Sequence, residues 1–597
     1  MCGIGGVFYR DKRKIDTQPL IDLRDKMHAR GPDGKGIWVN EDQYVGLVHR
    51  RLSIIDLSNA GSQPMCIDDG NIQIVFNGEI FNYRELKKKL LERGCTFTST
   101  SDTEVLLQMY KVYGHLMFEH LRGMFAFAIW DQNKEQLLIA RDQFGIKPLY
   151  YATVNNGIWF ASQVKALLKV DEIRKNLSSA GQVGFYLWGN IPEPFTLYED
   201  IKMLPAGSYM IVGKEHFKIK EYFSLKDLFI RSSQQSNKDL SIQEKTTILK
   251  SALSNSVKYH LVADVPIGVF LSAGLDSSVI TALATENANA KISTYTLSFD
   301  KFKGTAMDES PYAEITSNHY QTKHNSQWID KEYFSSVFDD ILNSMDQPTL
   351  DGVNTFLVSK VVAGYGVKVA LSGLGGDELL HSYPQFGTIP KMKKYFSWCK
   401  HTPVVNEFFK NILSSLPGSV IPPKYAGLMK YGSSIGTAYF LARGLFMPWE
   451  LNAYLPANVI AEGLEQLNTL ENIENTIEGV ENEQMQISLL EYSYFMRNQL
   501  LRDADWASMA HSLEIRVPFV DIELLKAVLP LMSSGEKLSK KALYSVPKKK
   551  LPEEIANRKK TGFNIPVPEW LQEIKGIKND NNYRAWAKYT YEHYISN

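Results

Sequence analysis

The second residue of the chain is a cysteine, in the opening run Met1-Cys2-Gly3-Ile4-Gly5. Removal of Met1 would leave a thiol and a free α-amine on this one residue. Because an α-amine titrates near ~8, part of it is neutral at pH 7 and can accept the thiol proton. This is the nucleophile-plus-base arrangement of covalent catalysis. A small residue at position 2 also simply suits methionine removal, so the remaining motifs must decide between the two interpretations.

Three further short motifs could serve the same chemistry. Asn77-Gly78-Glu79 follows a strand pattern and precedes a helical one, so the Asn77 amide and the Gly78 N–H suit an oxyanion hole. The same Asn-Gly pair is also typical of a hairpin turn. Arg51 offers a cation for a carboxylate. Asp102 offers an anion for an ammonium, although it also lies where a helix start is expected.

Two glycine-bearing loops in the middle of the chain have the composition of phosphate-binding loops. They are Ser272-Ala273-Gly274-Leu275-Asp276-Ser277-Ser278 and Ser372-Gly373-Leu374-Gly375-Gly376-Asp377-Glu378. Small residues let backbone N–H groups approach an anion, and a following helix N-terminus favours negative charge. Asp276 and Asp377 could share a Mg²⁺ ion that also binds phosphate oxygens. One such loop alone is more often a turn with a helix cap, and no Walker A pattern occurs in the chain.

The apolar pattern changes along the chain and predicts two kinds of domain. Up to about residue 165, short alternating segments indicate strands interrupted by helical stretches. Further on, continuous apolar runs at 265–271, 292–299 and 367–371 alternate with helical stretches. Such runs predict a parallel α/β sheet with ligands at the carboxyl ends of its strands. The polar stretch 231–238 between the two patterns suits a linker.

Bulk composition narrows the class of protein. The 597 residues predict about two to four domains. Lys+Arg and Asp+Glu both number 66, so we expect no nucleic-acid partner. No apolar run reaches the ~18–20 residues of a membrane span and the start lacks a signal-peptide pattern, so we expect a cytoplasmic protein without membrane contacts. The four cysteines have neither disulfide nor zinc spacing: Cys2, Cys66, Cys95 and Cys399.

The N-terminal motifs together resemble the class II, or N-terminal-nucleophile, glutamine amidotransferase domain. The matching pieces are Cys2-Gly3-Ile4, Arg30-Gly31-Pro32-Asp33, Arg51-Leu52-Ser53-Ile54, Asn77-Gly78-Glu79-Ile80, Ser101-Asp102-Thr103-Glu104 and the stretch 141–151. The resemblance implies an αββα sandwich in which Cys2 is nucleophile and base, while Asn77 and Gly78 form the oxyanion hole. It further implies a glutamine-binding set: Arg51, Asn77, Gly78, Glu79 and Asp102.

The first glycine loop resembles the pyrophosphate loop of the ATP pyrophosphatases, with Ala273 in place of a glycine. Combined with the glutaminase motifs, it makes the chain similar to the glutamine-hydrolysing asparagine synthetases over nearly its full length. The stretch 503–519 resembles that family's helix and following turn, and 558–563 resembles its lysine loop, in which Lys560 would contact the ATP phosphates. The resemblance implies the substrates ATP, glutamine and aspartate, bound Mg²⁺, and often a homodimer. It implies ATP binding at Leu271, Ser272, Ala273, Gly274, Asp276, Ser277, Leu297, Ser372 and Gly373, with Mg²⁺ at Asp276 and Asp377.

The resemblance also sets the expected architecture, an α/β and α+β chain of two domains. We expect a glutaminase domain at 2–210, a linker at 211–240 and an ATP-dependent synthetase domain at 241–597. The stretch at about 385–490 has a helical pattern without a motif and is expected to be a helical insertion.

Two residues depart from the family pattern. Position 374, usually acidic and linked to the acyl-adenylate, is Leu374, and Trp506 stands where an arginine is usual. Asp346 offers a replacement carboxylate from a neighbouring loop; alternatively the enzyme amidates a different carboxylate, such as a sugar uronate or a peptide acid. A non-catalytic descendant would be expected to lack Cys2 or Lys560, and both are present. A phosphoribosyl or sugar-isomerase amidotransferase would share only the first domain.

Overall fold

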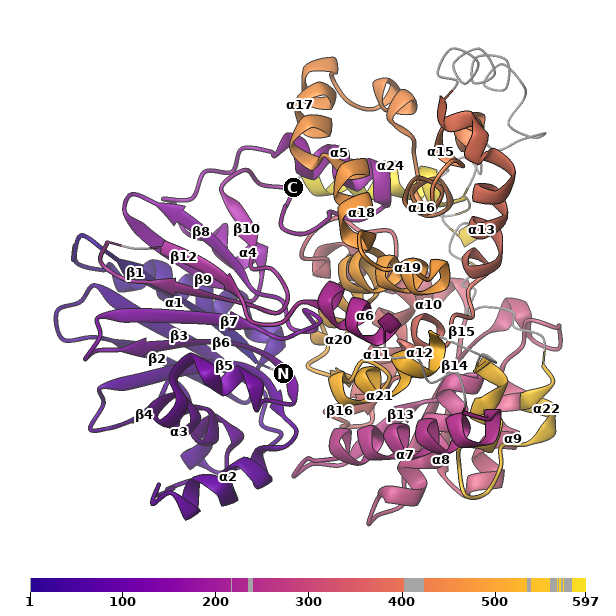
Figure 1. The fold of residues 1–597 in the computed structure, drawn as a ribbon. Helices are drawn as coiled ribbons and strands as arrows, with labels where there is room; N and C mark the ends of the chain where they lie inside the picture. Colours follow the sequence, from indigo (N-terminus) through magenta and orange to yellow (C-terminus); the bar gives the residue numbers. More distant parts are fainter. Residues whose placement is uncertain are drawn as a thin grey trace.

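The computed structural model describes residues 2–215, 217–234, 240–401, 423–533, 538–558, 566, 569–570, 573 and 582–596. Figure 1 shows a β-rich half built from the first part of the chain, beside a larger, mainly helical half that surrounds a second sheet. Within the described ranges, no helix is both long enough and apolar enough to cross a membrane.

The β-rich half contains two six-stranded antiparallel sheets. The β1 sheet has the strand order β10-β8-β9-β1-β3-β2, and the β5 sheet has the order β12-β11-β7-β6-β5-β4. The strands are β1 (Gly3–Tyr9), β2 (Gly34–Val39), β3 (Val45–Arg51), β4 (Met65–Ile67), β5 (Ile72–Ile80), β6 (Gly123–Asp131), β7 (Gln136–Arg141), β8 (Tyr150–Val154), β9 (Gly157–Ala161), β10 (Ile201–Met203), β11 (Ser208–Val212) and β12 (Phe217–Glu221).

Side-chain alternation explains how these two sheets stack. Ile4 and Phe8 of β1 lie in the apolar layer between the sheets, whereas Val7 faces the opposite side. There Val7 packs against helices α1 (Thr17–Lys26) and α4 (Val164–Leu167), and α2 (Tyr83–Glu92) and α3 (Asp102–Tyr113) cover the outer face of the β5 sheet in the same way. The predicted αββα sandwich is therefore confirmed.

The second half is built on a five-stranded sheet with the order β15-β14-β13-β16-β17, and every neighbouring pair is parallel. Because parallel strands need crossover connections, helices alternate with them and cover both faces. The predicted parallel sheet is confirmed. Its strands are β13 (Ile267–Phe270), β14 (Ser293–Phe299), β15 (Lys323–Ile329), β16 (Val369–Leu371) and β17 (Glu514–Arg516); its helices include α7 (Ile242–His260), α8 (Leu275–Asn287), α9 (Ser310–Tyr320), α10 (Lys331–Ser344), α11 (Val353–Gly364), α20 (Arg502–Met509) and α21 (Ile522–Met532).

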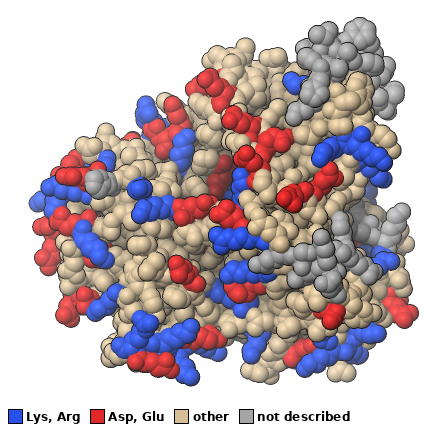
Figure 2. All heavy atoms as spheres, in the orientation of Figure 1, with Lys and Arg blue, Asp and Glu red and all other residues tan. Residues whose placement is uncertain are grey.

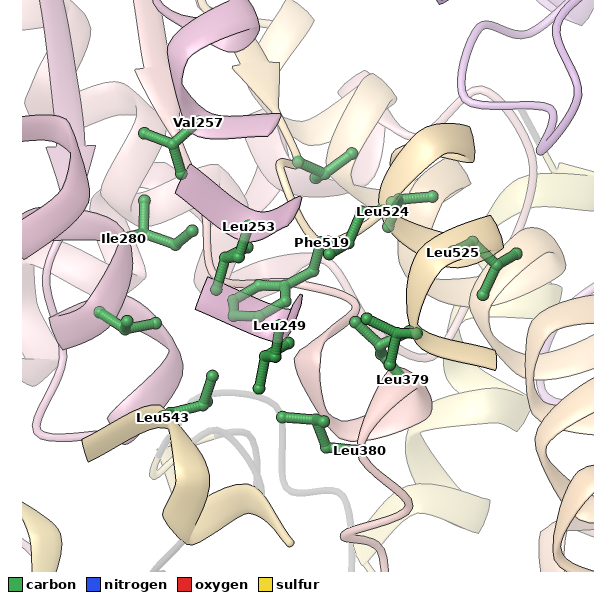
Figure 3. Packing of buried hydrophobic residues seen from close by; sticks show 14 of the residues in the cluster. Leu249, Leu253, Val257, Ile280, Leu379, Leu380, Phe519, Leu524, Leu525 and Leu543 are labelled. Carbon is green, nitrogen blue, oxygen red and sulfur yellow. The ribbon is translucent and has the colours of Figure 1, made fainter. Parts of the chain in front are cut away.

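One hydrophobic core packs helices α7, α8 and α21 against one face of this sheet. Leu249, Leu253 and Val257 recur on α7 at helical spacing and point toward Ile280 of α8 and Phe519 (Figure 3). This core also takes up residues from the ends of β13, β16 and β17. The carboxyl ends of the strands, where ligands are expected, are thus held on a rigid base.

The helical region after β16 has a core of its own. Its helices are α13 (Gln385–Phe396), α15 (Leu428–Tyr431), α16 (Ile435–Arg443), α17 (Ala457–Leu467), α18 (Thr469–Ile477) and α19 (Glu483–Leu490), followed by a π-helix at Glu491–Leu501. This core includes α5 (Ser179–Trp188) from the first part of the chain and α24 (Asn582–Ser596) from its end, and Figure 1 shows both beside α16 and α17. The predicted insertion is mainly helical over its described residues, and it joins the two halves.

The boundary between the halves lies later than the sequence predicts. Strand β12 falls inside the predicted linker 211–240, yet it pairs with β11 and completes the β5 sheet. Helix α6 (Leu225–Gln234) then packs into the core of the second half. Because β12 is an edge strand whose side chains are mostly exposed and polar, its sequence resembles a linker.

The surface agrees with the balanced charge of the chain. On the face shown in Figure 2, acidic and basic side chains lie interspersed rather than gathered by sign. On this face the charges therefore form no one-signed patch of the kind that attracts a polyanion.

Candidate active sites

Cys2 lies buried at the start of β1, where the sandwich meets the second half. Its backbone N–H donates a hydrogen bond to Oδ1 of Asn77 at 2.9 Å, and its Sγ lies 3.9 Å from the carbonyl oxygen of Leu52. Burial raises the pKa of the Cys2 thiol, so the thiol stays protonated until a base removes its proton. The structure therefore brings two predicted catalytic residues, Cys2 and Asn77, into direct contact.

Asn77 and Gly78 form the end of β5 that faces Cys2. Asn77 is fully buried, and its Nδ2 has no hydrogen-bond partner in the described part of the chain. Gly78 has φ of +148°, and a Cβ at this position would lie 2.0 Å from the carbonyl oxygen of Met124, so only glycine fits. An unpaired buried amide beside a nucleophile is the donor that a developing oxyanion needs.

The remaining glutamine-binding candidates divide into two groups. Glu79 and Asp102 are buried near Cys2: Asp102 accepts a hydrogen bond from the N–H of Ile80 at 3.0 Å, and Glu79 lies 3.5 Å from Arg516 of β17. Burial raises the pKa of Glu79 well above its usual range and that of Asp102 to about 6. Arg51, by contrast, donates hydrogen bonds to backbone carbonyls of the loop at 56–58 and not to Cys2 or Asn77.

A buried ion pair links the nucleophile to the second half of the molecule. Arg30 donates a hydrogen bond from Nε to the carbonyl oxygen of Cys2 at 3.1 Å. Its two terminal nitrogens bind Asp505 of α20 at 2.6 and 3.0 Å, and both side chains are buried. Arg30 belongs to a motif noticed in the sequence, but its partner lies 475 residues away and gives no local signal. The pair holds the backbone at Cys2 against α20.

A cavity of about 300 Å³ lies at the carboxyl ends of β13, β14 and β16. The two glycine loops contact each other there, since a Cβ on Gly373 would lie 2.9 Å from the backbone nitrogen of Ser277. Ala273 is not among the lining residues, and its N–H points to Oε2 of Glu309 at 3.5 Å. The predicted residues that line the cavity are Leu271, Ser272, Gly274, Asp276, Ser277, Leu297, Ser372, Gly373 and Leu374.

The two predicted Mg²⁺ ligands converge on one cation. Lys540, which sequence reasoning missed, places its ammonium against both Asp276 and Asp377, at 2.5 Å from the latter. Burial alone would lower the pKa of Lys540, but the two carboxylates raise it. Two carboxylates that meet one cation in this way also fit a divalent ion that shares phosphate oxygens. Lys560, the predicted phosphate contact, lies outside the described residues.

Asp346 does not replace the acidic residue missing at position 374. Its carboxylate accepts hydrogen bonds from the N–H groups of Val164 and Lys165 at 2.8 and 3.0 Å, at the start of α4. It therefore fixes the interface between the halves and is not among the residues that line the cavity. Leu374 lines the cavity and packs against the main core of the second half.

Fold and sites together define a class of protein, a glutamine amidotransferase sandwich joined to a parallel-sheet synthetase domain. Comparison with known families agrees: residues 1–223 match the glutamine amidotransferase domain, and residues 249–582 match asparagine synthase. The chain belongs to the family of glutamine-hydrolysing asparagine synthetases.

Individual relatives match over most of their length. Glutamine-hydrolyzing asparagine synthetase 1 of Bacillus subtilis is 32% identical over 593 residues, which cover 96% of this chain and 88% of the relative. Asparagine synthetase 3 of the same organism is 28% identical, with 97% and 91% covered. The amidase chry2 of Gibberella zeae is 28% identical, with 88% and 82% covered.

Proposed function

We propose that this protein is an ATP-dependent, glutamine-hydrolysing asparagine synthetase. One observation carries the proposal. A single chain holds a buried cysteine against an asparagine whose Nδ2 has no hydrogen-bond partner among the described residues, and its other half holds a cavity lined by two glycine loops. Glutamine hydrolysis at the first site would supply ammonia, and carboxylate activation at the second site would supply its acceptor.

At the first site, removal of Met1 would expose the α-amine of Cys2. The amine takes the thiol proton, and the sulfur attacks the side-chain amide carbon of glutamine. The Nδ2 of Asn77 and the N–H of Gly78 stabilise the oxyanion, while Arg51 and Asp102 bind the carboxylate and the ammonium of the substrate. Ammonia leaves, and water then releases glutamate from the thioester.

At the second site, the backbone N–H groups of the two glycine loops bind the phosphates of ATP. An oxygen of the acceptor carboxylate attacks the α-phosphorus, and pyrophosphate leaves. Ammonia then attacks the acyl carbon, and AMP leaves with the electron pair of the broken C–O bond. Asp276 and Asp377 would hold Mg²⁺, which when bound neutralises phosphate charge. Lys560 would stabilise the charge that develops on pyrophosphate.

A second candidate function follows from Leu374. A leucine side chain can neither take a proton nor bind an ammonium, so the site departs from the family where the acceptor is expected. A related amidotransferase that acts on a sugar uronate or a peptide acid would keep both half-reactions and differ only in the acceptor. The homodimer stays a prediction from the family, and the cytoplasmic location stays a prediction from the sequence.

Pyrophosphate release distinguishes the two candidates. Purified protein with Mg-ATP and ammonium is assayed with and without L-aspartate, and the product is identified by mass spectrometry. Aspartate-dependent pyrophosphate with an equal amount of asparagine supports the synthetase. Glutaminase activity without any response to aspartate would reject asparagine synthesis and favour a different carboxylate.

A further inference from the structure

One of the two departures from the family pattern lines the synthetase cavity, and the other contacts a residue that lines it. Leu374 is among the lining residues, whereas Trp506 donates a hydrogen bond from its indole Nε1 to Oδ1 of Asp503, a lining residue, at 2.8 Å. The indole also packs on Gly352, which has φ of +91° and where a Cβ would lie 2.6 Å from the ring.

Two carboxylates, Asp351 and Asp503, line the cavity. Asp503 is fixed: besides the Trp506 bond at Oδ1, its Oδ2 accepts hydrogen bonds from Thr349 and Gln499, the former at 2.9 Å. Burial and then the neighbouring Asp351 raise the pKa of Asp503 to about 7. The two carboxylates are therefore close enough to repel each other, so a cation bound near them is favoured.

Asp351 is the carboxylate of the pair that has room for a ligand. Its Oδ1 accepts a hydrogen bond from the N–H of the next residue, Gly352, at 2.8 Å. The structure gives its other oxygen no hydrogen bond within the described ranges, and the residue is only partly buried, on the cavity wall. A carboxylate that lines a cavity and keeps one oxygen without a hydrogen bond in the described part of the chain is suited to bind an ammonium group through a charge-assisted hydrogen bond.

We propose that Asp351 binds the α-ammonium group of the acceptor and thereby selects an amino acid over a dicarboxylic acid that lacks the amine. Asp503, held by its three donors, lines the same cavity. This inference rests on the proposed function. It places the acceptor beside the glycine loops, within the same cavity as the nucleotide.

Succinate tests this assignment, because it is aspartate without the ammonium group. Pyrophosphate release with Mg-ATP and ammonium is measured for both acids in the full-length protein. We expect the wild type to prefer aspartate. In Asp351→Asn, which keeps the size and the bond from Gly352, kcat/KM for aspartate should fall about 10- to 100-fold, as expected for a lost charged hydrogen bond. The value for succinate should not fall, so the preference collapses.

Two further variants separate a binding role from a structural one. Asp351→Glu keeps the charge and should retain the preference for aspartate. Asp340→Asn, an exposed carboxylate paired with Lys360 outside the cavity, should behave as the wild type. A wild type that uses succinate as well as aspartate, or an Asp351→Asn protein that still prefers aspartate, overturns the inference while leaving the synthetase function intact. No aspartate-dependent pyrophosphate from the wild type rejects the proposed function itself.

Discussion

The amide of Asn77 gives the sharpest prediction for the glutaminase half. Its Oδ1 holds the backbone N–H of Cys2 at 2.9 Å, and its buried Nδ2 has no partner within the described residues. An unpaired buried donor costs about 1–3 kcal/mol in the resting protein, which a ligand oxygen recovers. Replacing Asn77 with alanine removes this donor, so kcat for glutamine hydrolysis should fall about 10²–10³-fold, or roughly 3–4 kcal/mol of transition-state stabilisation.

The assay follows glutamate released from glutamine, with ammonia-dependent pyrophosphate release measured on the same sample. Asn77→Asp is the matched second variant. It keeps an oxygen that can accept the N–H of Cys2, but it replaces the NH₂ donor of the amide with a charged oxygen. Both variants should lose glutaminase activity and keep the ammonia-dependent reaction. An Asn77→Asp protein with normal kcat for glutamine would refute the oxyanion-hole assignment.

Three other residues give independent predictions. Lys540→Met leaves Asp276 and Asp377 without their shared ammonium, so the free energy of unfolding should drop by about 3 kcal/mol. Mg²⁺ should then raise the melting temperature more than in the wild type, and equal Mg²⁺ shifts in calorimetry would count against this. Asp505→Asn leaves Arg30 buried without its charge partner and should cost about 3 kcal/mol in urea unfolding, whereas an unchanged midpoint would contradict the link. Burial and then Glu491 raise the pKa of Glu378 to about 7, so the folded state favours the protonated acid and loses stability as pH rises through that value. Relative to Glu378→Gln, the wild type should lose about 2 kcal/mol between about pH 5 and pH 8; parallel pH curves would show that Glu378 does not titrate there.

The sequence predicts those parts of the sites that lie on contiguous stretches. Cys2 and Asn77 are each recognisable in a short motif, and the structure brings them to 2.9 Å. The glycine loops follow continuous apolar runs, so their place at the strand ends follows from the rules of parallel sheets. A short motif is enough to predict these parts of the sites because the backbone N–H groups of a single loop supply most of the proposed hydrogen-bond donors.

Other contacts at the proposed sites are invisible in the sequence because tertiary packing alone creates them. Lys540 reaches Asp276 across 264 residues of chain, and no pattern around Lys540 marks it. Asp351 lies at the turn before α11, where a carboxylate also suits an ordinary helix start. Asp346 shows the converse case, in which the sequence suggests a site residue that the structure places elsewhere. Its carboxylate accepts a hydrogen bond at the N-terminus of α4 and is not among the residues that line the cavity.

Transfer of the amide nitrogen from glutamine to asparagine tests the central claim most directly. Wild-type protein and Cys2→Ala are each supplied with Mg-ATP, aspartate and glutamine labelled with ¹⁵N in the side-chain amide, and asparagine is analysed by mass spectrometry. The two-site account predicts ¹⁵N-asparagine from the wild type, none from Cys2→Ala, and asparagine from both proteins when ammonium replaces glutamine. Labelled asparagine formed without Cys2, or no asparagine from ammonium in either protein, would contradict it.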